Sequence, residues 1–192
     1  MQQVLFYLQL GFEHICDRAA LDHLLFLVAL CAIYRLQQWK HILVLVTAFT
    51  IGHSITLAMV ALGGLTIPSQ LIEFLIPTTI VFVAINNVVS QSAATMKMGR
   101  NYAMALFFGL IHGTGFSNYF RALLMDSSAV VMPLLGFNLG IELGQLFVVS
   151  VIVVVAFICL NVLNVRQRDW NVFVSGAAFG VGVTMMMDTW PW

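Results

Sequence analysis

Six side chains that could bind a metal or move a proton lie in or beside apolar stretches of the chain. They are His14, Asp22, His23, His53, His112 and Glu142. Imidazole together with carboxylate suits divalent Zn, Ni, Cu or Fe. A charged group at the centre of a membrane-spanning helix costs about 2.5–3.5 kcal/mol on lenient scales, so such groups are functional candidates. We therefore predict an intramembrane site for a divalent transition-metal ion, formed by these six residues.

The elements that must position these residues are membrane-spanning helices. Hydrophobic residues make up 61% of the chain, charged residues 8%, and the mean hydropathy is +0.98. Soluble domains contain about 45–50% apolar and about 25% charged residues. The chain therefore has too little charge to cover a water-facing surface, and a lipid bilayer is its expected surrounding. The net charge is zero, which gives no support for a nucleic-acid partner.

Six stretches are long and apolar enough to cross a membrane, which requires about 20 residues each. This predicts an all-α, polytopic bundle of about six transmembrane helices, forming a single transmembrane domain over residues 1–192. The expected spans are approximately residues 19–36, 41–62, 69–89, 102–124, 132–163 and 170–187. Residues 1–17 could form either a short interfacial helix or a re-entrant segment packed on the outside.

Basic residues in alternate connections predict the orientation of the bundle. They are Arg35, Lys40, Lys97, Arg100, Arg166 and Arg168. Cytoplasmic loops carry the excess of Lys and Arg in membrane proteins. We therefore expect a multi-pass protein of the bacterial inner membrane with both termini on the extracytoplasmic side.

The expected spans place the polar residues at similar depths. His53, His112 and Glu142 each fall about ten residues from the outer end of their span, or about 15 Å at 1.5 Å per residue. Asp22 and His23 lie somewhat nearer the outer surface. Because such groups must face the bundle interior or a wet cavity, we expect them to converge in the outer half of the bilayer.

A metal-ligating imidazole usually makes a hydrogen bond through its second nitrogen. The side chains that we expect to accept or donate these bonds are Ser54, Thr56, Asn138 and Gln145. Asn138 and Gln145 share one helical stripe with Glu142, and this stripe is expected to line a cavity.

Glycines form the opposite stripe of that span, at Gly136, Gly140 and Gly144. Gly176 and Gly180 repeat the same spacing in the last span. Small residues spaced by four allow close contact between helices. These faces could therefore serve packing within the chain or a homo-oligomer.

Five sequence runs carry a resemblance to a known family. They are Gly11–His14 (GFEH), Leu21–Phe26 (LDHLLF), Ala48–Leu57 (AFTIGHSITL), Phe108–Phe116 (FGLIHGTGF) and Gly136–Gln145 (GFNLGIELGQ). In this order they resemble the HupE/UreJ membrane proteins, which are accessory to nickel hydrogenases and ureases. The resemblance implies a nickel or other divalent-metal permease, and it maps the family's histidine and acidic positions onto the same six residues. Relatives often carry Glu-Asn where this chain has Asn86-Asn87.

Three functions are compatible with these residues. The first is a permease, in which His14 captures a divalent ion near the outer mouth and the other five residues bind it. The second is an intramembrane zinc-dependent hydrolase acting near the outer leaflet, with Glu142 or Asp22 as the general base. The third is a metal sensor or a structural metal site.

Overall fold

The computed structural model describes residues 2–17, 20–64, 67–90, 98–124 and 130–191, and these contain helices and no strands. The all-α prediction is therefore confirmed for the described residues. The α-helices are α1 (Gln2–Cys16), α2 (Leu21–Ala32), α3 (Trp39–Ala61), α4 (Ser69–Ser90), α5 (Met98–Leu124), α6 (Val131–Phe157) and α7 (Gln167–Asp188). A 3₁₀ turn, η2 (Leu36–Gln38), precedes α3, and a π-helical turn, η4 (Ile158–Val162), extends α6.

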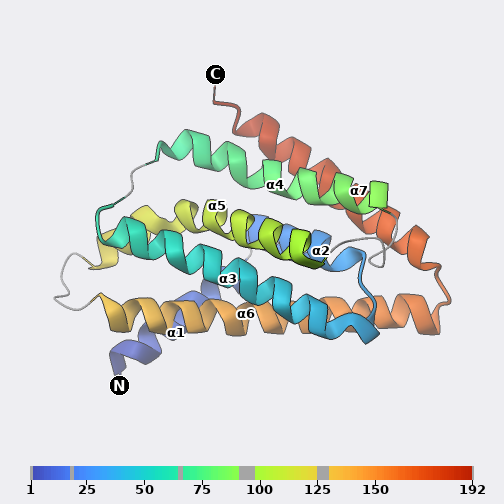
Figure 1. Ribbon diagram of the computed structural model, residues 1–192, viewed down its shortest axis with the longest axis horizontal. Helices are drawn as coiled ribbons and strands as arrows, with labels where there is room; N and C mark the ends of the chain where they lie inside the picture. The colour runs from blue at the N-terminus through green and yellow to red at the C-terminus, as the bar shows by residue number, and fades with distance from the viewer. Residues whose placement is uncertain (1, 18–19, 65–66, 91–97, 125–129, 192) are drawn as a thin grey trace.

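Three helix pairs surround the short helix α2. Helix α3 packs along α5, α1 along α6 and α4 along α7, and α2 lies between them in contact with α4, α6 and α7 (Figure 1). Helix α2 ends, and α3, α5 and α7 begin, at the same end of the bundle (Figure 1). The basic residues Arg35, Lys40, Arg100, Arg166 and Arg168 therefore gather at that end.

Within the described residues, four helical segments are long and apolar enough to cross a membrane: Leu36–Ala61, Ser69–Ser90, Val131–Val162 and Gln167–Asp188. The expectation of six spans is not confirmed by this criterion. Helix α2 has only 12 residues. Helix α5 has 27 residues but carries buried polar side chains at Asn101, His112, Thr114 and Ser117. These polar side chains face the interior of the bundle, and they lower the mean hydropathy of α5.

Helix α6 shows most clearly how the surface suits lipid. Its exposed large side chains include Leu135, Leu139, Leu143 and Phe147, which follow each other at one helical face. A neighbouring face, which carries Gly136, Gly140 and Gly144, packs against α1. An apolar exterior of this kind is stable where lipid, and not water, surrounds the protein.

The glycine stripe of α6 accommodates α1. A Cβ atom built on Gly136 would lie 2.9 Å from the carbonyl oxygen of Val4, and one built on Gly140 would overlap the carbonyl group of Leu8. One built on Gly144 would lie 3.0 Å from Cβ of Ile15. The predicted close helix contact is thus made within the chain. In the last span, Gly176 and Gly180 have open space beside them, and Gly182 instead contacts α4.

Helices α1 and α2 together replace the expected first span. The contacts of α1 with successive α6 glycines show that the two helices run in parallel, and α1 ends beside Gly144. Helix α2 then continues in the same direction from Leu21 through the centre of the bundle (Figure 1). The prediction that residues 19–36 form one continuous span was wrong, because α2 is about 18 Å long at 1.5 Å per residue. Residues 1–17, whose structure the sequence left open, contain α1 and precede this segment.

Candidate metal site

Four histidines from four helices meet where α1 ends and α2 begins. His14 comes from α1, His23 from α2, His53 from α3 and His112 from α5. The ring centroid of His23 lies 4.8 Å from that of His14, 5.9 Å from that of His53 and 5.1 Å from that of His112. The predicted convergence of His23, His53 and His112 is therefore present in the fold, with His23 at the centre and His14 beside it.

Glycines place His53 and His112 on adjoining helix faces. A Cβ atom on Gly113 would lie 2.6 Å from the carbonyl oxygen of His53, and one on Gly52 would overlap the carbonyl oxygen of Leu106. Each histidine thus adjoins a glycine at which the backbones of α3 and α5 touch. Without side chains at these two positions, the helices approach closely enough to bring both imidazoles towards His23.

Asp22 orients the imidazole of His23. The two residues are neighbours in the first turn of α2, and Nδ1 of His23 lies 3.0 Å from Oδ1 of Asp22. The same carboxylate oxygen accepts a hydrogen bond of 2.8 Å from the backbone N–H of His23. When Nδ1 carries the proton of this contact, the lone pair of Nε2 is available to a metal. Carboxylate–histidine–metal arrangements of this type are common in metal sites.

The possible ligand atoms form two overlapping sets, and within each set the atoms lie within 4.8 Å of one another. One set comes from His14, His23 and His53, and the other from Asp22, His23 and His112. His53 and His112 are fully buried. The atoms without a hydrogen-bond partner include Nε2 of His14 and His23 and both ring nitrogens of His53. An unpartnered buried polar atom costs about 1–3 kcal/mol. A divalent metal would satisfy several of these atoms at once, so the donor set fits such an ion.

Thr79 of α4 binds the remaining imidazole. Its hydroxyl lies 2.9 Å from Nε2 of His112, which leaves Nδ1 of His112 without a partner. The sequence did not single out this threonine, which lies two residues after Pro77 inside α4. Its position in an apolar helix was the only available signal, and several other threonines share it.

Three of the four predicted hydrogen-bonding residues bond to groups other than the imidazoles. Ser54 and Thr56 donate to backbone carbonyls of Thr50 and Leu110, and Gln145 accepts a bond of 2.7 Å from the Thr50 hydroxyl. Oδ1 of Asn138 has no hydrogen-bond partner. The imidazoles instead contact Asp22, which bonds to His23, and Thr79, which bonds to His112.

Glu142 also lies apart from the histidine groups. Oε1 of Glu142 accepts a hydrogen bond of 2.7 Å from Thr47, whereas Oε2 is buried without a partner. Thr47 precedes His53 by six residues on α3, which corresponds to about 9 Å along the helix axis. Neither metal-ligating set contains Glu142.

Aromatic rings close the cluster on the side that faces the C-terminal end of α2. Phe26 follows His23 by one turn on α2, and its ring stacks on that of Phe49 with centroids 4.7 Å apart. Both rings lie 5.1 Å from the ring of His112. Their side chains are almost completely buried, so an ion at the histidines would face hydrocarbon in this direction.

A cavity of about 480 Å³ adjoins the cluster on its other side. His14, Asp22, His23 and His112 line it, together with Glu13, Asp17, Glu73 and several apolar side chains. His53 is absent from this lining and lies behind the other imidazoles. Water and ions in the cavity would therefore meet His14, His23 and His112 before His53.

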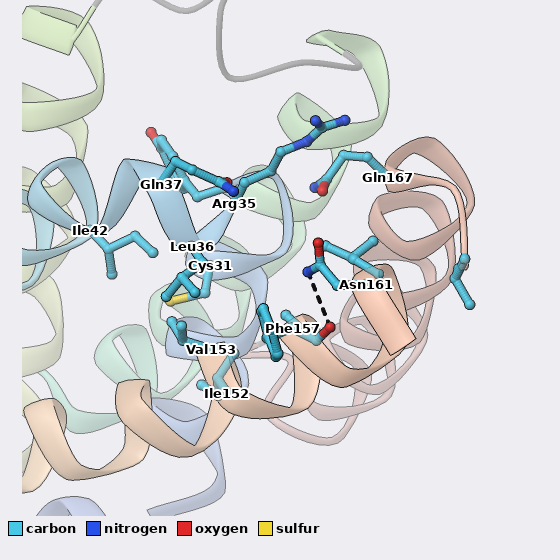
Figure 2. Close-up of a pocket in the computed structure, with 14 residues that line it drawn as sticks. Cys31, Arg35, Leu36, Gln37, Ile42, Ile152, Val153, Phe157, Asn161 and Gln167 are labelled. Carbon is cyan, nitrogen blue, oxygen red and sulfur yellow. Dashed lines mark hydrogen bonds between the residues drawn. The ribbon is translucent and has the colours of Figure 1, made fainter. Parts of the chain in front are cut away.

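A second, smaller cavity of about 140 Å³ lies at the opposite end of α2 (Figure 2). Cys31 and Arg35 line it beside Phe157, Asn161 and Gln167. Asn161 donates a 3.1 Å hydrogen bond to the carbonyl of Phe157, shown by the dashed line in Figure 2. The π-helical turn η4 thus forms one wall of this cavity.

Comparison with known proteins agrees with the resemblance found in the sequence. A family model described as HupE / UreJ protein matches residues 1–191, essentially the whole chain. Neither a curated protein nor a solved structure gives a match.

Proposed function

Since the chain belongs to the HupE / UreJ family, we propose that it is a membrane permease for a divalent transition metal, with nickel as the expected cargo. One observation carries the proposal: a nitrogen atom from each of His14, His23 and His53 lies within 4.8 Å of the other two, and each of these residues has a buried ring nitrogen without a hydrogen-bond partner. Partial dehydration of the ion would be offset by these nitrogen ligands.

The interrupted helix at the site supports transport. Helix α1 ends at Cys16 and α2 begins at Leu21, and the metal-ligating His14 and His23 lie on either side of the interruption. Many transporters bind their substrate where a transmembrane helix is discontinuous near mid-membrane. Such sites are formed there because half-helix ends and released backbone groups can change their contacts as access alternates.

The two cavities at the ends of α2 also support transport. His23 lines the larger cavity and Cys31 the smaller one, and eight residues separate them, or about 12 Å of helix. Phe26 and Phe49 close this interval. Access to the histidines from the smaller cavity would therefore require movement of this short aromatic barrier, and not the opening of a complete span.

The positive-inside rule assigns the two sides. The end of the bundle that carries Arg35, Lys40, Arg100, Arg166 and Arg168 would face the cytoplasm. The histidine cluster and its larger cavity would then open to the extracytoplasmic side of a bacterial inner membrane. Both termini would face the same side, as the sequence predicts.

Metal flux into proteoliposomes tests this function. Purified protein would be reconstituted with a metal-sensitive dye inside, and Ni²⁺ would be added outside. We expect His53→Ala to lower the initial flux at least tenfold, whereas His41→Ala, an exposed histidine near the beginning of α3, should retain it. Equal flux through wild-type and His53→Ala proteoliposomes, or none above protein-free vesicles for Ni²⁺, Zn²⁺ and Co²⁺, would contradict the proposal.

An intramembrane zinc hydrolase is the second candidate, favoured by the open side of the cluster. Three imidazoles could hold Zn²⁺ and leave one position towards the 480 Å³ cavity for water. The two predicted general bases are each hydrogen-bonded, Asp22 to His23 and Glu142 to Thr47. Cleavage of a lipid ester by the zinc-loaded protein, with no metal flux, would favour this function over transport.

A further inference from the structure

We propose that Glu13, Asp17 and Glu73 form an outer capture site for hydrated divalent cations, from which the ion passes to the histidines. The proposal rests on the metal-binding function above and adds a separate first step to it. These three residues line the 480 Å³ cavity and are all exposed. None belongs to either metal-ligating set.

The described residues that line the cavity have a negative formal charge. They contain the carboxyl groups of Glu13, Asp17, Asp22 and Glu73, and no Lys or Arg is among them. Gln9 donates a 2.8 Å hydrogen bond to Oε1 of Glu13 and thereby holds this carboxylate on the last turn of α1. Clefts lined by charge of one sign between low-dielectric walls raise the local concentration of counter-ions.

The carboxyl end of α1 adds to this potential. Glu13 lies in the last turn of α1 and Asp17 follows directly after it, and the backbone N–H of Asp17 donates to the carbonyl of Glu13. The C-terminal end of a helix carries a partial negative charge of about half an elementary charge. Glu73 contributes from a separate helix, α4.

Buried imidazoles in the same cavity indicate that the acidic residues serve a ligand. The side chains of His23 and His112 are 4% and 0% exposed, and each retains a ring nitrogen without a hydrogen-bond partner. Both residues line the cavity together with the three carboxylates. An ion attracted to the acidic mouth would therefore have unpaired nitrogen donors directly below it.

The two sites would differ in selectivity because their ligand atoms differ. Carboxylates bind hard ions such as Mg²⁺ and Ca²⁺, often through water, whereas imidazole suits Ni²⁺, Co²⁺ and Zn²⁺. The capture site would accept any hydrated divalent cation and accelerate its arrival. The histidines would then retain only a transition metal.

Stopped-flow absorbance with Co²⁺ tests the proposal on purified full-length protein in detergent. The test variant combines Glu13→Gln, Asp17→Asn and Glu73→Gln. We expect its association rate at low salt to be at least tenfold lower than that of the wild type. The final Co²⁺ spectrum should be the same, since the ligands are intact. Raising the salt concentration should slow the wild type and have little effect on the variant.

A matched variant removes two exposed carboxylates that do not line the cavity, Asp169→Asn with Asp188→Asn, and should keep the wild-type rate. Mg²⁺ should slow Co²⁺ association to the wild type more than NaCl of equal ionic strength, and this difference should vanish in the triple variant. The single variant Glu73→Gln, on α4, repeats the measurement without changes near the end of α1.

The capture site is overturned if the triple variant associates with Co²⁺ as fast as the wild type and with the same salt dependence. It is also overturned if the matched variant slows equally, because the effect would then come from overall charge. Failure of the metal-binding function has a different signature, namely a wild type that gives no Co²⁺ spectrum at equilibrium or a His53→Ala variant that gives an unchanged one.

Discussion

Gly113→Ala should displace His53 without removing any ligand. In the structure, a Cβ atom at this position would lie 2.6 Å from the carbonyl oxygen and 2.9 Å from Cα of His53. An ordinary carbon–oxygen contact is about 3.3 Å, so α5 would have to move away from α3 by roughly 0.7 Å at this level. The obstructing atoms belong to the backbone and cannot rotate away. Overpacking of this kind costs about 1–3 kcal/mol.

The displacement matters for metal binding because ligand distances are tolerated within about 0.2 Å. His53 on α3 and His112 on α5 lie beside this contact, and both approach His23. We expect the affinity for Ni²⁺ to fall about 10–100-fold, as it does when residues that orient metal ligands are replaced. Isothermal titration of purified protein in detergent measures this affinity, and the unfolding temperature measured in parallel should fall as well.

Gly176→Ala provides the matched control. Gly176 lies on the exposed face of α7, and a Cβ atom there would have open space within 4 Å. Alanine favours a helix by about 0.5–1 kcal/mol over glycine, so this variant should be as stable as the wild type or slightly more stable. Unchanged Ni²⁺ affinity and unfolding temperature in Gly113→Ala would refute the argument that α3–α5 contact sets the geometry of the cluster.

Three further replacements test other parts of the fold. Asp22→Asn should lower Ni²⁺ affinity about 10–100-fold in equilibrium dialysis, because the amide orients His23 less strongly than a carboxylate; full affinity would show that Asp22 has no orienting role. Phe26→Leu should increase the release of Ni²⁺ from loaded proteoliposomes, since the ring that stacks on Phe49 is lost; an unchanged rate would exclude this pair as the barrier. Gly140→Val should displace α1 from α6 and lower the unfolding temperature; a fully stable variant would contradict the described packing.

Much of the site could be predicted from the sequence because lipid penalises polar groups strongly. His23, His53 and His112 stand out in apolar surroundings, and the cost of leaving them unpaired made convergence the expected solution. The structure brings these three residues together with His14 and Asp22. Composition alone likewise led to the all-helical class, because a helix satisfies its backbone hydrogen bonds internally in lipid.

The first span shows where local sequence was insufficient. Residues 19–36 are apolar enough to suggest a single helix, yet α2 covers only Leu21–Ala32, and a separate helix, α1, precedes it. Hydropathy records how well each residue suits lipid, but not which part of a span is supplied by another segment. The separation of α1 from α2 depends on the packing of α1 against the glycine face of α6, which is more than a hundred residues away in the chain.

The sequence by itself indicated a helical membrane protein and singled out the candidate donor residues, because both depend on the chemistry of single residues in hydrocarbon. Only the tertiary structure decided that Thr79 contacts His112, that Glu142 lies with Thr47, and that Glu73 shares a cavity with Glu13. These pairings join residues of different helices. They depend on how the helices rotate and cross, which is set by the packing of all of them together and not by the spacing along any one.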